Sequence, residues 1–301
     1  MRSNNEIREK NKQERGTKMK FGMNSLAWQS PVTEIDRLLK LAKQYDCDVF
    51  ELALEDFSTL DTDVVNKAIE ENGIPIKTVC GAHGPSRDIS ADEEEYRESG
   101  IQYGKDMVDF CVAIGADVIA GPIYSAVGKA RQQTPEEIEQ KWKYGVENMK
   151  ILADYAAKKD VKFAVEPLNR FETDFINIVE QGVDFIHRIG YDNVGFLLDA
   201  FHMGIEEANV PAAIRMAGTE CKIFDFHASA NNRGTPGLDN TNWVGIRDAV
   251  RDVGYDDYFI IESFTPDCVE IAKAASVWRP FSESPESIAR DGIPFLKELF
   301  A

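Results

Sequence analysis

The sequence contains few of the residues that mark disulfide-linked or zinc-ribbon proteins. Its 301 residues include five cysteines, and none of them forms a CxxC pair. The cysteines are scattered through apolar segments, which is typical of small core residues in a reducing compartment. We therefore expect a cytoplasmic protein.

An excess of positive charge is also missing, because the formal net charge at pH 7 is −18. Phosphate backbones are bound by clustered Lys and Arg, so nucleic acid is not an expected partner. The longest apolar runs have the length of strands, and the first 20 residues are polar, so neither a membrane span nor a secretory signal is expected.

The first 18 residues differ in composition from the rest of the chain. Residues 1–20 hold seven Lys or Arg against three Asp or Glu and almost no aliphatic residues. Such a segment has too little apolar surface to form a packed core. We expect a disordered extension over residues 1–18 and a single folded domain over residues 19–301.

Apolar, β-branched segments alternate with segments of helical periodicity along this domain. Eight segments are predicted strands: 20–28, 47–54, 74–81, 117–123, 161–168, 194–201, 221–229 and 258–264. Helices are predicted between them, as at 33–46, 92–115, 135–159 and 177–190. Capping patterns begin at Thr33 and Thr134. Glycines that suit helix ends are Gly73, Gly115, Gly190, Gly218 and Gly254.

Near-continuous apolar strands that alternate with helices indicate a parallel sheet covered by helices. Eight such units in this length predict a closed (β/α)₈ TIM barrel of the α/β class. A doubly wound open sheet is the competing fold. That fold would place a glycine-rich phosphate turn after the first strand, and FGMNSLAWQSP is not one.

Four polar residues stand at the ends of the last four predicted strands. They are Glu166, Asp199, His227 and Glu262, spaced by about 30 residues, the length of one strand–helix unit. Active sites of such barrels lie at the carboxyl ends of the strands. Three carboxylates and an imidazole that converge in a dry pocket would repel each other unless a cation lies between them. The sequence therefore predicts a divalent-metal site formed by these four residues.

The ligand set also restricts the metal. Three oxygen ligands, one nitrogen and no thiolate suit Mn²⁺, Mg²⁺ or Co²⁺ better than structural zinc. The four histidines of the chain are too few for the His-rich trinuclear zinc sites of barrel endonucleases. We expect one divalent ion, with Mn²⁺ as the first choice.

Further polar and aromatic residues lie close to these positions in the sequence. Glu172, His202 and Arg233 each follow a predicted ligand by a few residues, and are candidates for substrate contact. His83 and Trp28 follow predicted strands at the same rim, and are further candidates. A salt-bridged loop, a solvated arginine or a packing aromatic residue are the alternative interpretations of these positions.

The motifs, in this order, resemble those of the ketose 3-epimerases, a branch of the xylose isomerase-like barrels. The segments that carry the resemblance are VEPLNRFETDFIN, LLDAFHMGIEE, FHASANNRG, IIESF and VWRPFS. The resemblance implies that Glu166 and Glu262 both bind metal and exchange the substrate proton, with Asp199 and His227 as the other ligands. It implies contacts of Glu172, His202 and Arg233 with the ketose near C1 to C3, and a homodimer or homotetramer.

The sequence departs from the family pattern at positions that handle the far end of the sugar. Gly204 stands where the common motif has Asn, and Tyr124 replaces a usual histidine. The segment GPIYSAVG also lacks a typical tryptophan. These departures leave the identity of the sugar open.

The expected function is metal-dependent epimerisation at C3 of a free ketose through an enediolate. Another metal-dependent sugar isomerase, a dehydratase or a 3-keto-glycoside lyase on the same barrel would use the same proton chemistry. A hydrolytic metal enzyme and a non-catalytic barrel are the more distant alternatives. No cluster of Lys or Arg marks a phosphate pocket, so the small-molecule partner is predicted to be an unphosphorylated sugar.

Overall fold

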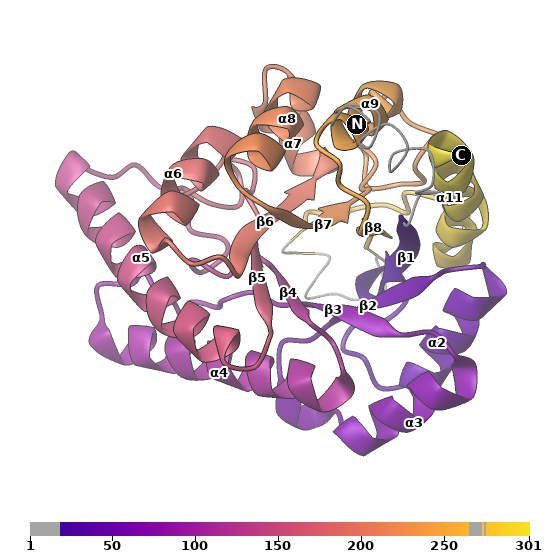
Figure 1. The fold of residues 1–301 in the computed structure, drawn as a ribbon, viewed down its shortest axis with the longest axis horizontal. Helices are drawn as coiled ribbons and strands as arrows, with labels where there is room; N and C mark the ends of the chain where they lie inside the picture. Colours follow the sequence, from indigo (N-terminus) through magenta and orange to yellow (C-terminus); the bar gives the residue numbers. More distant parts are fainter. Residues whose placement is uncertain (1–18, 265–272, 274) are drawn as a thin grey trace, which may run out of the picture.

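Eight parallel strands close into a barrel in the computed structural model, which describes residues 19–264, 273 and 275–301. The predicted (β/α)₈ architecture is confirmed, and Figure 1 shows the ring of strands surrounded by the helices. Residues 1–18, which we expect to be disordered, lie outside the described residues. Within the described part of the chain, no helix combines the length and apolar character needed to cross a membrane.

The strands are shorter than the apolar segments that predict them. They are β1 (Lys20–Asn24), β2 (Val49–Ala53), β3 (Ile76–Cys80), β4 (Val118–Gly121), β5 (Lys162–Val165), β6 (Val194–Asp199), β7 (Ile223–His227) and β8 (Tyr258–Ile261). Strand β1 pairs with both β2 and β8, which closes the barrel.

Helices follow the strands and cover the outside of the barrel (Figure 1). The α-helices are α2 (Ile35–Gln44), α3 (Thr62–Asn72), α4 (Glu94–Ile114), α5 (Pro135–Ala157), α6 (Val179–Ile189), α7 (Ala200–Glu206), α8 (Val210–Glu220), α9 (Trp243–Asp252) and α11 (Pro285–Phe300). Short 3₁₀ helices occupy η1 (Ser25–Ala27) and η2 (Phe57–Thr59).

Two of the predicted helix ends differ from the structure. Helix α5 has the predicted capping box of Thr134 and Glu137. The N-cap of α2 is Glu34 and not Thr33, and its side chain makes no capping hydrogen bond. Gly73, Gly115 and Gly190 end helices in the left-handed conformation, as predicted. Gly218 instead lies inside α8, where a Cβ atom would come within 2.5 Å of Val253, so close helix packing requires this glycine.

Alternation along the strands gives the barrel interior an apolar lower part and a polar upper end. Residues two apart on a strand face the same side. Inside the barrel, Leu197 therefore lies below Asp199, and Ile260 lies below Glu262. Apolar residues of the strands form a separate buried cluster: Val49, Val118, Ala120, Ala164, Leu197, Phe224, Tyr258 and Ile260. The polar end of the barrel therefore lies above a buried layer of mostly apolar residues.

The close approach of β1 to β2 depends on a glycine. A Cβ atom on Gly22 would lie 2.3 Å from the carbonyl oxygen of Val49, whereas one on Gly204 in α7 would meet nothing within 4 Å. We predict that Gly22→Ala lowers the free energy of unfolding by about 1–3 kcal/mol through overpacking. The matched change Gly204→Ala should be neutral or stabilise the protein by up to about 1 kcal/mol. Urea unfolding followed by circular dichroism measures both, and equal losses would contradict this account of β1.

Candidate active site

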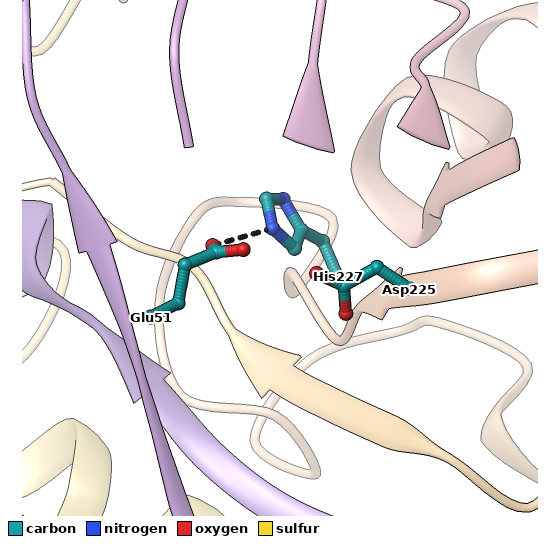
Figure 2. A group of neighbouring side chains, drawn as sticks. All are labelled: Glu51, Asp225 and His227. Carbon is teal, nitrogen blue, oxygen red and sulfur yellow. Dashed lines mark hydrogen bonds and ion pairs between the residues drawn. The ribbon is translucent and has the colours of Figure 1, made fainter. Parts of the chain in front are cut away.

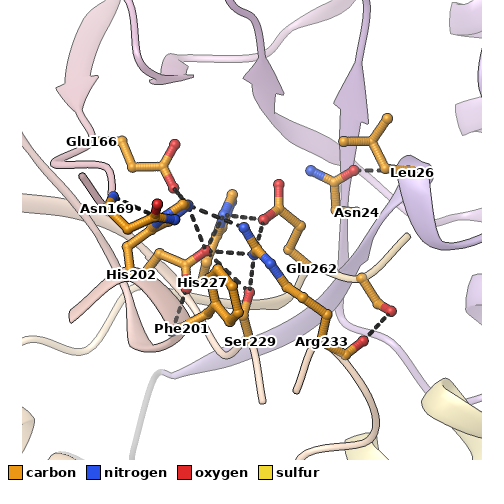
Figure 3. Close-up of polar contacts among 12 residues, drawn as sticks. Asn24, Leu26, Glu166, Asn169, Phe201, His202, His227, Ser229, Arg233 and Glu262 are labelled. Atoms are coloured by element: carbon orange, nitrogen blue, oxygen red, sulfur yellow. Dashed lines mark hydrogen bonds and ion pairs between the residues drawn. The ribbon is translucent and has the colours of Figure 1, made fainter. Parts of the chain in front are cut away.

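The four predicted metal ligands lie at the carboxyl end of the barrel. Asp199 and His227 are the last residues of β6 and β7, and Glu166 and Glu262 directly follow β5 and β8. Each side chain is almost fully buried, with exposed fractions of 4% for Glu166, 1% for Asp199, 0% for His227 and 5% for Glu262. Figure 3 shows Glu166, His227 and Glu262 converging on one region.

The distances among these groups are those of a compact polar cluster. One possible metal-binding atom from each of Asp199, His227 and Glu262 lies within 4.8 Å of the other two. Glu166 forms a similar group with Asp199 and His202. His227 Nδ1 lies 3.6 Å from Glu262 Oε2 and 3.8 Å from Asp199 Oδ2. Asp199 therefore belongs to both groups and links the two halves of the site.

Arg233 brings the positive charge into this cluster. Its Nη1 donates to Glu262 Oε2 at 2.7 Å and to Asp199 Oδ2 at 3.0 Å, and its guanidinium stacks on Phe201 at 3.9 Å from the ring centroid. The Ser263 hydroxyl donates to the Arg233 carbonyl at 2.6 Å and so anchors the loop to the end of β8. Arg233 is thus a buried member of this cluster and not a solvated loop residue.

Burial and charge act in opposite directions on the carboxylates. Burial raises the pKa of Glu166 well above its usual range, and the charge of Glu262 adds to that shift. Burial also raises the pKa of Asp199, although Arg233 opposes this. Burial has the same tendency at Glu262, but the positive charges of His227 and Arg233 outweigh it and lower that pKa. The negative charge of the three carboxylates is therefore only partly offset by Arg233 and His227.

These observations fit a divalent cation. His227 Nδ1 is buried without a hydrogen-bond partner and faces two carboxylates. Hard divalent ions prefer carboxylate oxygens, and many of them accept one imidazole nitrogen as well. The buried acidic residues and His227 can bind a metal ion.

Of the predicted substrate contacts, His202 lies beside the predicted ligands, and Glu172 is connected to it through Asn169. His202 Nδ1 accepts the backbone N–H of Asn169 at 3.1 Å, and its Nε2 lies 3.7 Å from Glu166 Oε1. Burial lowers the pKa of His202 well below its usual value, so the ring is neutral. The Glu172 carboxylate accepts a hydrogen bond from Asn169 Nδ2 at 2.8 Å, and burial raises its pKa. Their contacts with a sugar remain predictions.

His83 and Trp28 have different surroundings. His83 is buried in the loop after β3, neither ring nitrogen has a partner, and burial lowers its pKa to about 4. Trp28 stacks on Phe50, and its indole N–H donates to the Pro285 carbonyl at 3.3 Å. The structure gives Trp28 a packing role, while the free imidazole nitrogens of His83 suit a polar contact. Substrate binding stays a prediction for both.

Sequence analysis missed a second buried polar layer below the ligands. Glu51 is on β2, and its Oε1 lies 2.8 Å from Nε2 of His227 (Figure 2). Asp225 lies two residues before His227 on β7. Both carboxyl groups have an exposed fraction of 0%. A charged residue inside an apolar strand, the signal that identifies Glu166, is also present in VFELA and IFDFH.

Comparison with known proteins identifies the family. A family profile described as xylose isomerase-like TIM barrel matches residues 39–299. The chain belongs to the xylose isomerase-like TIM barrel family. It is 31% identical to a probable ketose 3-epimerase of Synechocystis sp. (strain ATCC 27184 / PCC 6803 / Kazusa), over 94% of this chain and 97% of the relative.

Two further relatives agree with this assignment. A D-psicose 3-epimerase of Ruminiclostridium cellulolyticum (strain ATCC 35319 / DSM 5812 / JCM 6584 / H10) is 30% identical, over 79% of this chain and 81% of the relative. The solved structure of an L-ribulose 3-epimerase superposes with a TM-score of 0.87 at 26% identity, and the match covers 94% of each chain. The resemblance of this family member to the ketose 3-epimerases, which are carbohydrate isomerases, is confirmed.

The metal site can be tested through stability. We predict that Mn²⁺ added to chelator-treated protein raises its melting temperature, because an ion that binds only the folded state stabilises it by ~2.7 kcal/mol at a hundredfold excess over Kd. Asp199→Asn should remove most of this gain. Asp88→Asn is the control, since Asp88 is equally buried but bonds to Ser90 and Lys129. Differential scanning calorimetry that shows no Mn²⁺ effect on the wild type would contradict the site.

Proposed function

We propose that this protein is a metal-dependent ketose 3-epimerase. The observation that carries the proposal is the position of Glu166 and Glu262, which enter the site from β5 and β8. In Figure 3 the two side chains approach His227 from different sides. The proposed substrate carbon would have one of these carboxylates on each side, which inversion at a single carbon requires. The named activities of the relatives support the same reaction.

The proton transfers follow from this placement. One carboxylate removes the C3 proton from one face of the ketose, and the electron pair of the C–H bond moves into the C2–C3 bond to form an enediolate. The other carboxylate then returns a proton to the opposite face of C3. Because the enzyme works in both directions, Glu166 and Glu262 exchange the roles of base and acid.

The residues proposed to hold the cation are Glu166, Asp199, His227 and Glu262. A divalent ion there supplies positive charge that stabilises the oxyanion character developing at C2 and C3. The oxygen-rich ligand set favours Mn²⁺, with Mg²⁺ or Co²⁺ as the other choices. Burial of the four ligands excludes water and strengthens every electrostatic interaction in the site.

The remaining polar residues orient the sugar. Arg233 has donors fixed by Asp199, Glu262 and the Phe201 ring, and His202 has a fixed ring orientation through Asn169. We assign His202, Arg233 and Glu172 to the hydroxyl and carbonyl groups near C1 to C3. Side chains that are already held in place lose little freedom when the sugar binds, which favours reaction.

The substrate proposed here is an unphosphorylated ketose. The lysines on the loop after β4 and at the start of α5 are neutralised by carboxylates, since Lys129 pairs with Asp88 and Lys141 pairs with Asp174. The charge of Arg233 is similarly offset by Asp199 and Glu262. A phosphoryl group would need positive charge that is not already offset, and these pairs leave none.

We also propose a cytoplasmic location and a homodimer or homotetramer. Cys47, Cys80, Cys111 and Cys221 are free thiols, which suits a reducing compartment. Phe171 and Trp278 are each 74% exposed, and large exposed apolar side chains suit contact between subunits.

Proton exchange in D₂O tests the function. We predict that Mn²⁺-loaded protein incubated with fructose, tagatose, ribulose or sorbose converts one of them to its C3 epimer with deuterium at C3. Proton NMR of the recovered sugars measures both changes. Deuterium at C3 without the epimer would favour the alternative of a lyase, dehydratase or other isomerase. The absence of exchange with every sugar would contradict the ketose assignment.

A further inference from the structure

Glu51 is a buried carboxylate that the proposed proton transfers do not use. It lies on β2, inside the barrel, with an exposed fraction of 0%. Its register partner on β1 is Asn24, whose Nδ2 donates to Glu51 Oε1 at 2.6 Å. A carboxylate in the interior of a barrel is costly to desolvate, so its contacts indicate what it does there.

The second partner of Glu51 is the metal-ligand candidate His227. Glu51 Oε1 lies 2.8 Å from His227 Nε2, and Figure 2 shows the carboxylate facing the imidazole edge. An ionised carboxylate can only accept, so Nε2 carries the hydrogen in this contact. In a ring that binds a cation, the lone pair would then be on Nδ1, which faces Asp199 and Glu262 at 3.8 and 3.6 Å.

Asp225 completes the setting of Glu51. Oxygen or nitrogen atoms of Glu51, Asp225 and His227 lie within 4.8 Å of one another. Asp225 Oδ1 accepts the backbone N–H of Phe226 at 2.8 Å, which fixes that carboxyl group. The hydrogen bond from Asn24 therefore holds Glu51 in a position from which it reaches His227, with Asp225 close by.

We infer that Glu51 is a positioning residue that holds His227 with Nδ1 directed at the cation, and so sets the affinity of the site for metal. Carboxylates that bind the second nitrogen of a ligand histidine fix its tautomer and ring orientation. This inference rests on the proposed metal site, and it adds a residue from β2 to a site otherwise built from β5 to β8. Glu51 touches neither the substrate space nor the other ligands through a hydrogen bond.

A purely structural role would have a different consequence. If the hydrogen bonds of Glu51 only stabilised the barrel interior, the loss of Glu51 would lower the stability of the protein. The metal affinity of the folded protein would then be unchanged. Thr78 provides the matched control, because it is the register partner of Glu51 on β3 and is equally buried. Its hydroxyl has no hydrogen-bond partner, so Thr78→Val alters polarity in the same layer without removing a contact.

The test is the dissociation constant for Mn²⁺ of chelator-treated protein, measured by isothermal titration calorimetry. We expect Glu51→Gln to weaken binding by about ten- to a hundredfold. Thr78→Val should bind within twofold of the wild type. An affinity of folded Glu51→Gln within twofold of the wild type would overturn the inference. Failure of the wild type to bind Mn²⁺ would instead overturn the proposed metal site.

A second measurement leaves both Glu51 and His227 in place. Nitrogen NMR of histidine-labelled, Mg²⁺-loaded wild type reports the tautomer of each ring. The chain has only four histidines, so substitution of the other three identifies the His227 signals. We expect a hydrogen on Nε2 of His227 and none on Nδ1. A hydrogen on Nδ1 would overturn the inference, because that nitrogen could not then face the cation.

Discussion

The structure depends on the burial of several carboxylates in one small volume at the end of the barrel. Glu166, Asp199 and Glu262 are at most 5% exposed, and like charges in a low-dielectric pocket repel strongly. Arg233 offsets part of this repulsion through its contacts with Asp199 and Glu262. A divalent cation would offset the rest. The carboxylates that would hold the ion are also the groups that we propose to accept and return a proton.

The barrel can hold these buried charges because its lower part is packed with apolar residues that stabilise the fold. Leu197 and Ile260 lie two residues before Asp199 and Glu262, so each strand passes from a hydrophobic floor to a polar end. Glu51 lies between the two regions and joins β2 to the site through His227. The polar groups are therefore supported from below by the packed floor and from the side by hydrogen bonds.

The alternation of strands and helices, and the four polar residues at strand ends, were predictable from the sequence because each depends on a local pattern. The helix ends were less predictable: Gly218 serves packing against Val253, a contact between distant segments that no local pattern encodes. The partnership of Glu51 with His227 joins β2 to β7, so sequence spacing could not reveal it. Trp28 was ambiguous for the same reason, since its neighbours Phe50 and Pro285 come from other elements.

In the proposed mechanism, Glu166 and Glu262 act on opposite faces of one carbon. The most direct test compares deuterium exchange at C3 of each epimer of the identified substrate in Glu166→Gln and Glu262→Gln. We expect that neither variant interconverts the epimers. Each variant should exchange the C3 proton of one epimer only, and the exchanged epimer should differ between the two variants. Exchange of both epimers by either variant would contradict the two-carboxylate arrangement.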